Sequence, residues 1–225
     1  TYTETQTCIL STGVSIEGDA AATTIIRADE TGAWSSLLQL DSPDGTNATQ
    51  SISKVTLDGQ FVSSTNFKTW VAIWVTGRSN VSIHDCIIKN FKQSGVILTG
   101  INENNPGTDA GKIHATGNRF YNNSVTNCAA MYQGTGQGSL MIGFQDGLLI
   151  YNNLIQQNER PNFENGWPLK YHNQGWLKGC KIYNNTLIKK PYSGDYPGEN
   201  GNWDFAIEFF NIQGLEIYGN DIQNG

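Results

Sequence analysis

The sequence predicts an all-β fold built from stacked copies of one repeat made of short strands. Three copies share a clear pattern, and each runs from a Gly through an Ile-Tyr pair to a second Ile. They occupy residues 147–155, 179–188 and 214–222. Their first isoleucines, Ile150, Ile182 and Ile217, are separated by 32 and 35 residues. Because a recurrence of about 20–50 residues is the signature of a stacked array, we take these isoleucines as the anchors of the repeat.

Looser copies extend the repeat towards the N-terminus. They lie at Val14–Ala20, Val55–Val62, Val81–Ile88 and Ile113–Phe120. Their anchor positions hold Ile16, Leu57, Ile83 and Ala115. With the three clear copies this makes seven, so the sequence predicts about seven coils and almost no α-helix.

The composition fits many short strands with tight corners. Charged residues make up 15% of the 225-residue chain, and Gly, Asn and Thr are abundant. The length predicts a single domain over residues 1–225. No run of about 18 apolar residues is present, so we expect no membrane span. The net charge of −6 and the pI near 5.0 argue against a nucleic-acid partner, which would require a basic surface.

A polar column is predicted three residues after each anchor. It comprises Asp19, Gln60, Cys86, Asn118, Asn153, Asn185 and Asn220. Asn accommodates the αL conformation that a sharp bend between strands needs. Its side-chain amide can also donate and accept hydrogen bonds along a stack, so the column would satisfy polar groups that are otherwise buried.

This column resembles the asparagine ladder of right-handed parallel β-helices, the pectate-lyase-like superfamily. The resemblance covers essentially the whole chain and implies a single-stranded right-handed parallel β-helix. It also implies three strands per coil, with the Asn corner between the second and third strands. In members of this superfamily that cleave polysaccharides, the active groove lies on the face formed by the first strands. No catalytic motif of the superfamily is present here.

Phasing the coils in this way places long loops before successive first strands. The loops Asn127–Gly138, Gln156–Gly166 and Lys190–Trp203 lead into the strands Ser139–Phe144, Trp167–His172 and Asp204–Phe210. We therefore expect the three loops to stack on one side of one face. Loops longer than a connection requires are usually functional.

Alternation along the first strands assigns their outward residues. Trp167, Leu169 and Tyr171 are predicted to point into the core, which leaves Lys170 and His172 outside. In the next coil the same rule places Phe205, Ile207 and Phe209 inside, with Asp204 and Glu208 outside. The offset to the anchors then aligns one outward column, which consists of Trp74, Met141, Lys170 and Glu208.

These assignments predict a carbohydrate site on the first-strand face, because rings stack on sugar faces and carboxylates bind hydroxyl groups. The expected catalytic residues are Lys170, His172, Glu208 and Arg160. The expected substrate-binding residues are Trp74, Met141, Glu164, Trp203 and Asp204. A simpler interpretation makes Lys170 and Glu208 a cross-strand surface ion pair of little energetic weight.

Two catalytic routes stay open. A hydrolase needs two carboxylates, and Glu164 could supply the partner of Glu208, whereas Asp204 would lie roughly 13 Å from it along the strand. A lyase needs a base, for which Lys170 or Arg160 is available, with His172 as a second proton carrier. Ca²⁺ is a possible cofactor, held by Asp204, Glu208 or Glu164.

The predicted function is that of an extracellular enzyme acting on a polysaccharide. The alternative is a non-catalytic glycan-binding or adhesive module of a larger surface protein. Neither end shows the polar cap that a solenoid needs, so we expect a piece of a longer secreted or cell-surface chain. The cysteines, among them Cys86 and Cys180, are expected to be buried free thiols.

Overall fold

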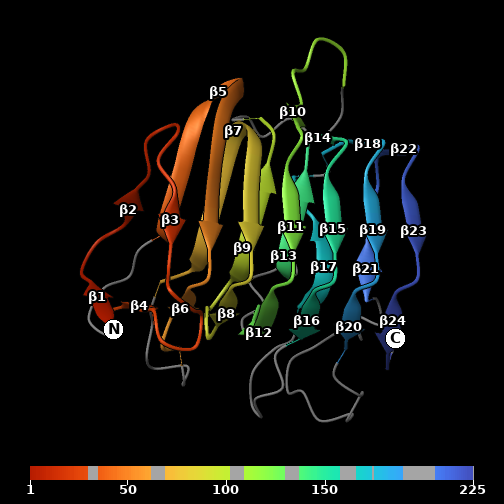
Figure 1. Ribbon diagram of the computed structural model, residues 1–225. Helices are drawn as coiled ribbons and strands as arrows, with labels where there is room; N and C mark the ends of the chain where they lie inside the picture. The colour runs from red at the N-terminus through yellow and green to blue at the C-terminus, as the bar shows by residue number, and fades with distance from the viewer. Residues whose placement is uncertain are drawn as a thin grey trace, which may run out of the picture.

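The structure is a computed structural model that describes residues 1–29, 35–61, 69–101, 109–129, 137–157, 166–173, 175–189 and 206–224. It confirms an all-β parallel solenoid, with strands stacked side by side along one axis (Figure 1). Within these residues no helix is long and apolar enough to cross a membrane.

Each turn of the solenoid contributes strands to stacked positions. The first-strand position holds β2 (Cys8–Ile9), the start of β5 (Ser36–Ser53), the start of β7 (Val71–His84), β9 (Ser94–Thr99), β13 (Gly138–Gly143), β17 (Trp167–Tyr171) and β21 (Ile207–Glu208). The second-strand position holds β3 (Ile16–Glu17), the ends of β5 and β7, β11 (Arg119–Tyr121), β15 (Leu149–Tyr151), β19 (Lys181–Tyr183) and β23 (Glu216–Tyr218).

The third-strand position forms one eight-stranded sheet. It holds β1 (Tyr2–Glu4), β4 (Ile25–Ala28), β6 (Thr56–Asp58), β8 (Ile87–Lys89), β12 (Ser124–Cys128), β16 (Leu154–Gln157), β20 (Thr186–Ile188) and β24 (Asp221–Gln223).

A fourth, very short strand position departs from the predicted three strands per coil. It holds β10 (Ala115–Thr116), β14 (Gln145–Asp146), β18 (Leu177–Lys178) and β22 (Ile212–Gln213). In the earlier coils β5 and β7 run through this corner without a break. There the buried Arg78 donates hydrogen bonds to Ser42, Gln50 and two backbone carbonyls. These bonds satisfy its guanidinium, which the continuous strand β7 carries into the corner.

The solenoid has about five turns, fewer than the seven predicted. The difference lies at the ends, where a copy has a neighbour on one side only. Ile217 in β23 is 46% exposed, whereas the equivalent Ile182 and Ile150 are fully buried. A copy of the repeat is therefore recognisable in the sequence even where it is not enclosed as a complete turn.

The asparagine ladder is present, with two changes of membership. Asn123, Asn153, Asn185 and Asn220 form it, and each side-chain oxygen accepts bonds from the backbone N–H and, where present, the amide of the residue in the preceding coil. Asn118 is not a member, because Phe120 rather than Ala115 pairs with the anchors Ile83 and Ile150.

The second change concerns Gln60. The anchor of its coil is Ile52, which pairs with Ile16 and Ile83, so the ladder position falls on Val55. Leu57 lies in the third-strand position, paired with Ile26 and Ile88. The predicted anchor was therefore one strand too late in this coil.

The αL bend belongs to the residue before each ladder Asn. Positive φ angles near 55° occur at Asn122, Asn152 and Asn184, and Gly219 has the same conformation. The exposed residue thus makes the bend while its buried neighbour makes the hydrogen bonds. Sequence reasoning had given both tasks to the ladder residue.

One apolar core cluster fills the interior along the stack, and it includes the anchors Ile52, Ile83, Phe120, Ile150 and Ile182. The cysteines of the described chain are free, and burial raises the pKa of Cys86 and Cys180 to about 11. These thiols are therefore unreactive packing groups, as expected, while Cys8 is only partly buried.

Candidate functional site

The register of the first strands confirms the predicted outward column and adds one residue. Trp74 pairs with Ile97, Ile97 with Met141, Met141 with Lys170, and Lys170 with Glu208. Ile97 was missed, although its place in the strand Ser94–Thr99 follows from the same alternation. Trp74, Met141, Lys170 and Glu208 therefore lie along one face of the solenoid.

An apolar strip occupies the middle of this column. Val71, Ile97 and Met141 form a cluster separate from the main core, and Trp70 and Trp74 pack against it. Ile97 is fully buried and Met141 nearly so, while Trp74 is partly exposed. The indole of Trp74 thus covers part of the strip and is itself accessible to solvent.

Lys170 forms the charged centre of the face. Its Nζ lies 3.2 Å from Oε2 of Glu208 in the next coil, and 3.5 Å from the centre of the Trp167 ring. The Lys170 side chain is only 6% exposed and that of Glu208 is 22% exposed. Burial lowers the pKa of Lys170, although Glu208 acts in the opposite direction by favouring the ammonium.

Trp167 was predicted to point into the core, and its side chain is among the largest that are fully buried. It does not belong to the main core cluster, which includes its neighbour Leu169. An ammonium is attracted to the face of an indole. The ammonium of Lys170 lies over the face of the Trp167 ring. Gly138 pairs with Trp167 in the neighbouring strand. A Cβ atom at Gly138 would clash with the Cβ atom of Lys170, so the position of Lys170 requires a glycine there.

His172 adjoins this centre, two residues further along. Its ring meets Trp74 edge-on, with the ring centres 6.2 Å apart and the planes at 77°. Burial lowers the pKa of His172 to about 4, so the imidazole is neutral at physiological pH. Its Nδ1 is buried and makes no hydrogen bond to any of the described residues.

The face is less open than predicted. Sequence reasoning placed Lys170 and His172 in a solvent-facing groove, but they are 5% and 9% exposed. They do lie outside the core as predicted, so the register is right and the exposure is wrong. The loops and side chains that would line the rim, Arg160, Glu164, Trp203 and Asp204, lie outside the described residues.

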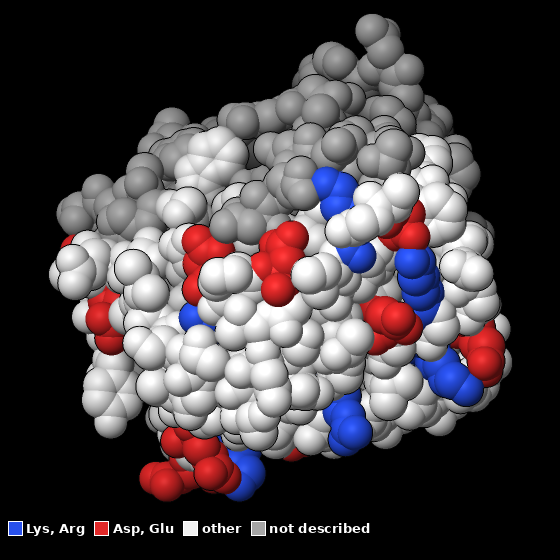
Figure 2. Space-filling view, turned by 90° about the horizontal axis from the view of Figure 1, so that it is seen from above, with Lys and Arg blue, Asp and Glu red and all other residues white. Residues whose placement is uncertain are grey.

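Surface charge on one side of the molecule and the metal ligands among the described residues do not mark a different site. On the side shown in Figure 2, acidic and basic side chains are interspersed rather than gathered into one patch. Within the described part of the chain, no group of three His, Cys, Asp or Glu side chains could hold a metal ion. Of the possible Ca²⁺ ligands Asp204, Glu208 and Glu164, Glu208 is the one whose position is described.

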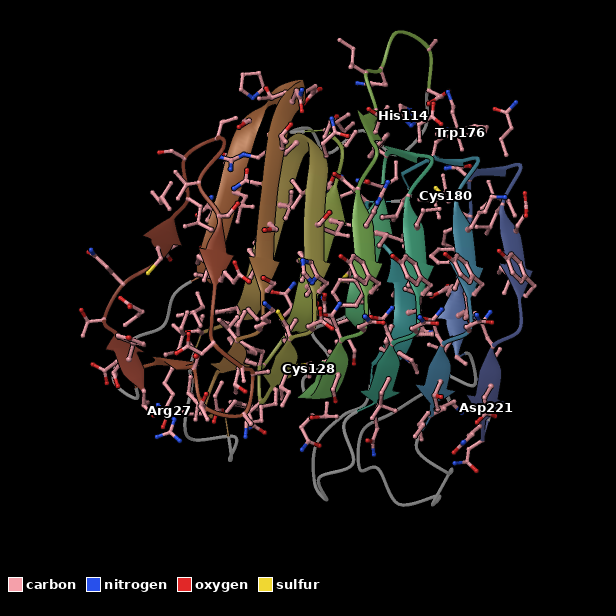
Figure 3. All side chains as sticks on the ribbon, viewed as in Figure 1. Arg27, His114, Cys128, Trp176, Cys180 and Asp221 are labelled. Carbon is pink, nitrogen blue, oxygen red and sulfur yellow. The ribbon has the colours of Figure 1, made fainter. Side chains whose placement is uncertain are left out.

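A second polar cluster lies at the corner strands and was not predicted. Asp109 contacts both His114 and Lys178, and the hydrogen bonds from these two residues outweigh burial and lower the pKa of Asp109. His114 and Trp176 lie at the same edge of the solenoid (Figure 3). Because β10 and β18 belong to different coils, Asp109 ties the segment before β10 to a later coil.

The comparisons with known proteins do not assign the chain to a family. No protein-family model matches it, and no curated protein matches its sequence.

Proposed function

We propose that the first-strand face binds a polysaccharide and that the protein acts on it as a lyase or glycoside hydrolase. The proposal includes membership of the pectate-lyase-like superfamily, which the sequence resembles, and a secreted or cell-surface location. The observation that carries it is that the Lys170–Glu208 pair lies on the same face as His172, which is two residues from Lys170 and whose ring contacts the partly exposed Trp74. Ionisable groups with shifted pKa values next to an aromatic surface are typical of a functional site.

The two chemical routes use these groups differently. In elimination, Lys170 would remove a proton beside a uronate carboxylate, and its lowered pKa would favour the free amine that a base requires. In hydrolysis, Glu208 would be one of two carboxylates flanking the glycosidic bond. Its partner would come from Glu164 or Asp204.

A binding module without catalysis is the second candidate. It is favoured by the enclosure of Lys170 and His172, because their burial limits the approach of a scissile bond. In that case Lys170 and Glu208 would fix the shape of the face, and Trp74 would carry the contact with sugar.

The test is incubation of the purified chain with a panel of neutral and uronate-containing polysaccharides. Unsaturated products identify a lyase, and reducing ends without unsaturation identify a hydrolase. Lys170→Ala and Glu208→Gln should each abolish turnover while circular dichroism stays unchanged. Binding without either product supports the module, and the absence of both binding and turnover across the panel contradicts the proposal.

A further inference from the structure

The charges at the centre of the first-strand face cancel. The ammonium of Lys170 is matched by the carboxylate of Glu208 at 3.2 Å, and it also lies over the rings of Trp167 and Tyr171. The nearby His172 is neutral because burial opposes its protonation. Lys170, Glu208 and His172 together therefore carry no net charge at neutral pH.

An anionic ligand would have to break this pair. Lys170 could bind a uronate carboxylate only by exchanging it for Glu208, which would leave a partly buried carboxylate without its cation. Removing one partner of a buried ion pair is strongly unfavourable. The pairing thus selects against a negatively charged sugar at this position.

A buried polar atom of this face suits a hydroxyl. Nδ1 of His172 is buried and has no hydrogen-bond partner among the described residues, and a buried polar atom in this state is costly. A hydroxyl can donate or accept a hydrogen bond, so it can satisfy either tautomer of a neutral imidazole. It brings no charge into the buried surroundings of His172.

An aromatic platform lies directly beside this nitrogen. Trp74 packs on the apolar strip, meets the edge of His172 and is partly exposed. A pyranose ring combines an apolar C–H face, which stacks on an indole, with hydroxyl groups around its rim. The two side chains together therefore present the complement of one uncharged sugar unit.

We propose that the ligand of the first-strand face is an uncharged polysaccharide that stacks a sugar ring on Trp74 and hydrogen-bonds a hydroxyl group to Nδ1 of His172. This inference rests on the proposed function and gives it a substrate class. It favours hydrolysis or binding over elimination, because elimination requires a uronate. Lys170 then holds Glu208 in place instead of binding a ligand carboxylate.

The test is calorimetric titration of the whole chain with two sets of oligosaccharides. The neutral set contains xylan, glucan and mannan fragments, and the anionic set contains galacturonan and alginate fragments. We expect binding by a member of the neutral set with an affinity that does not change with salt concentration. Binding by the anionic set alone, weakened by salt, overturns the inference but leaves the proposed function intact. Binding by neither set overturns both.

Two variants locate the subsite. Trp74→Ala removes the platform, and His172→Phe keeps a buried ring of similar shape but removes Nδ1. Each should weaken neutral-glycan binding by about tenfold or more, the equivalent of one good contact. The matched control is His84→Ala, which alters a partly buried histidine in β7 that contacts Asp85 and stacks on Tyr121. If affinity is unchanged in both site variants, the subsite is wrong.

Discussion

The ladder corner and the first-strand face lie on the same coils but treat buried polar groups in opposite ways. In the ladder, each Asn satisfies several buried backbone and side-chain groups in its own and neighbouring coils. On the face, within the described part of the chain, Nδ1 of His172 has no hydrogen-bond partner and Lys170 pairs with the carboxylate of Glu208. The comparison indicates that the ladder stabilises the fold. The face instead buries polar groups at a cost in free energy, which a stable scaffold can tolerate.

The strongest test of this contrast is Asn153→Ala. The change removes the acceptor for Asn123 and leaves the carbonyls of Phe120 and Tyr151 without the amide. At about 1–3 kcal/mol for each group left unsatisfied, we expect a loss of about 4 kcal/mol in the free energy of unfolding. Urea denaturation measures it, with the exposed Asn152→Gly as control, because glycine keeps the αL bend at that position. A loss no larger than that of the control would contradict the structural role of the ladder.

The next largest effect is the dependence of stability on the protonation of His172. Its pKa falls from 6.5 in the unfolded chain to about 4 in the folded protein. The stabilising contribution is complete above pH 6.5 and is lost as the pH falls to about 4, because only the unfolded state takes up a proton in this range. The total is about 3 kcal/mol, at about 1.4 kcal/mol for each pKa unit. Unfolding measured against pH should lose this component in His172→Phe, and an identical pH profile would contradict it.

A smaller effect concerns the buried ion pair. Lys170→Met alone should destabilise the fold by about 2 kcal/mol, since Glu208 keeps its charge in a partly enclosed position. Lys170→Met combined with Glu208→Leu should recover most of that loss, because two apolar residues replace the pair. Denaturation of the single and double variants provides the cycle. A double variant no more stable than Lys170→Met would contradict this expectation and show that the intact pair itself stabilises the fold.

The smallest effect is expected at the second-strand face. Lys181 and Glu216 pair at 3.1 Å, but their side chains are 42% and 54% exposed. Lys181→Ala should leave the free energy of unfolding unchanged within measurement error, because surface pairs contribute little. A loss comparable to that of Lys170→Met would remove the distinction between buried and exposed pairs.

The sequence predicts the fold well because the residues that define each repeat lie close together in the sequence. The three Ile-Tyr copies placed Asn153, Asn185 and Asn220 correctly, since each anchor and its ladder residue are only three positions apart. Asn123 was missed because Phe120 replaces the usual anchor isoleucine. In β5 one continuous strand of 18 residues hid the boundary between positions, which displaced the predicted anchor to Leu57.

The alignment of the outward column was predicted from the sequence, but its burial was not. Alternation places Lys170 and Glu208 in one outward column, since it depends only on parity along each strand. Burial is different, because it depends on side chains from several coils. Trp74 reaches His172 from a strand that lies three steps away on the sheet path, and no local pattern encodes that contact.

The tyrosines at the ends of the second strands show that a ring at the surface is not always a platform for a sugar. Tyr121, Tyr151, Tyr183 and Tyr218 stack on one another with ring centres about 5 Å apart, and the planes are nearly parallel. Each inner ring is therefore covered on both faces by its neighbours. The Trp74 ring meets His172 edge-on instead, so it remains the better candidate for sugar stacking.

The direction of the ladder bonds gives the solenoid an electrical polarity. Every ladder side-chain oxygen accepts from the preceding coil, so the amide dipoles of Asn123, Asn153, Asn185 and Asn220 add instead of cancelling. Their positive ends point towards the C-terminal coil, where the carboxylate of Asp221 follows Asn220 directly. Aligned hydrogen bonds polarise one another, so the loss of one asparagine weakens the bonds in the coils above and below it as well as its own.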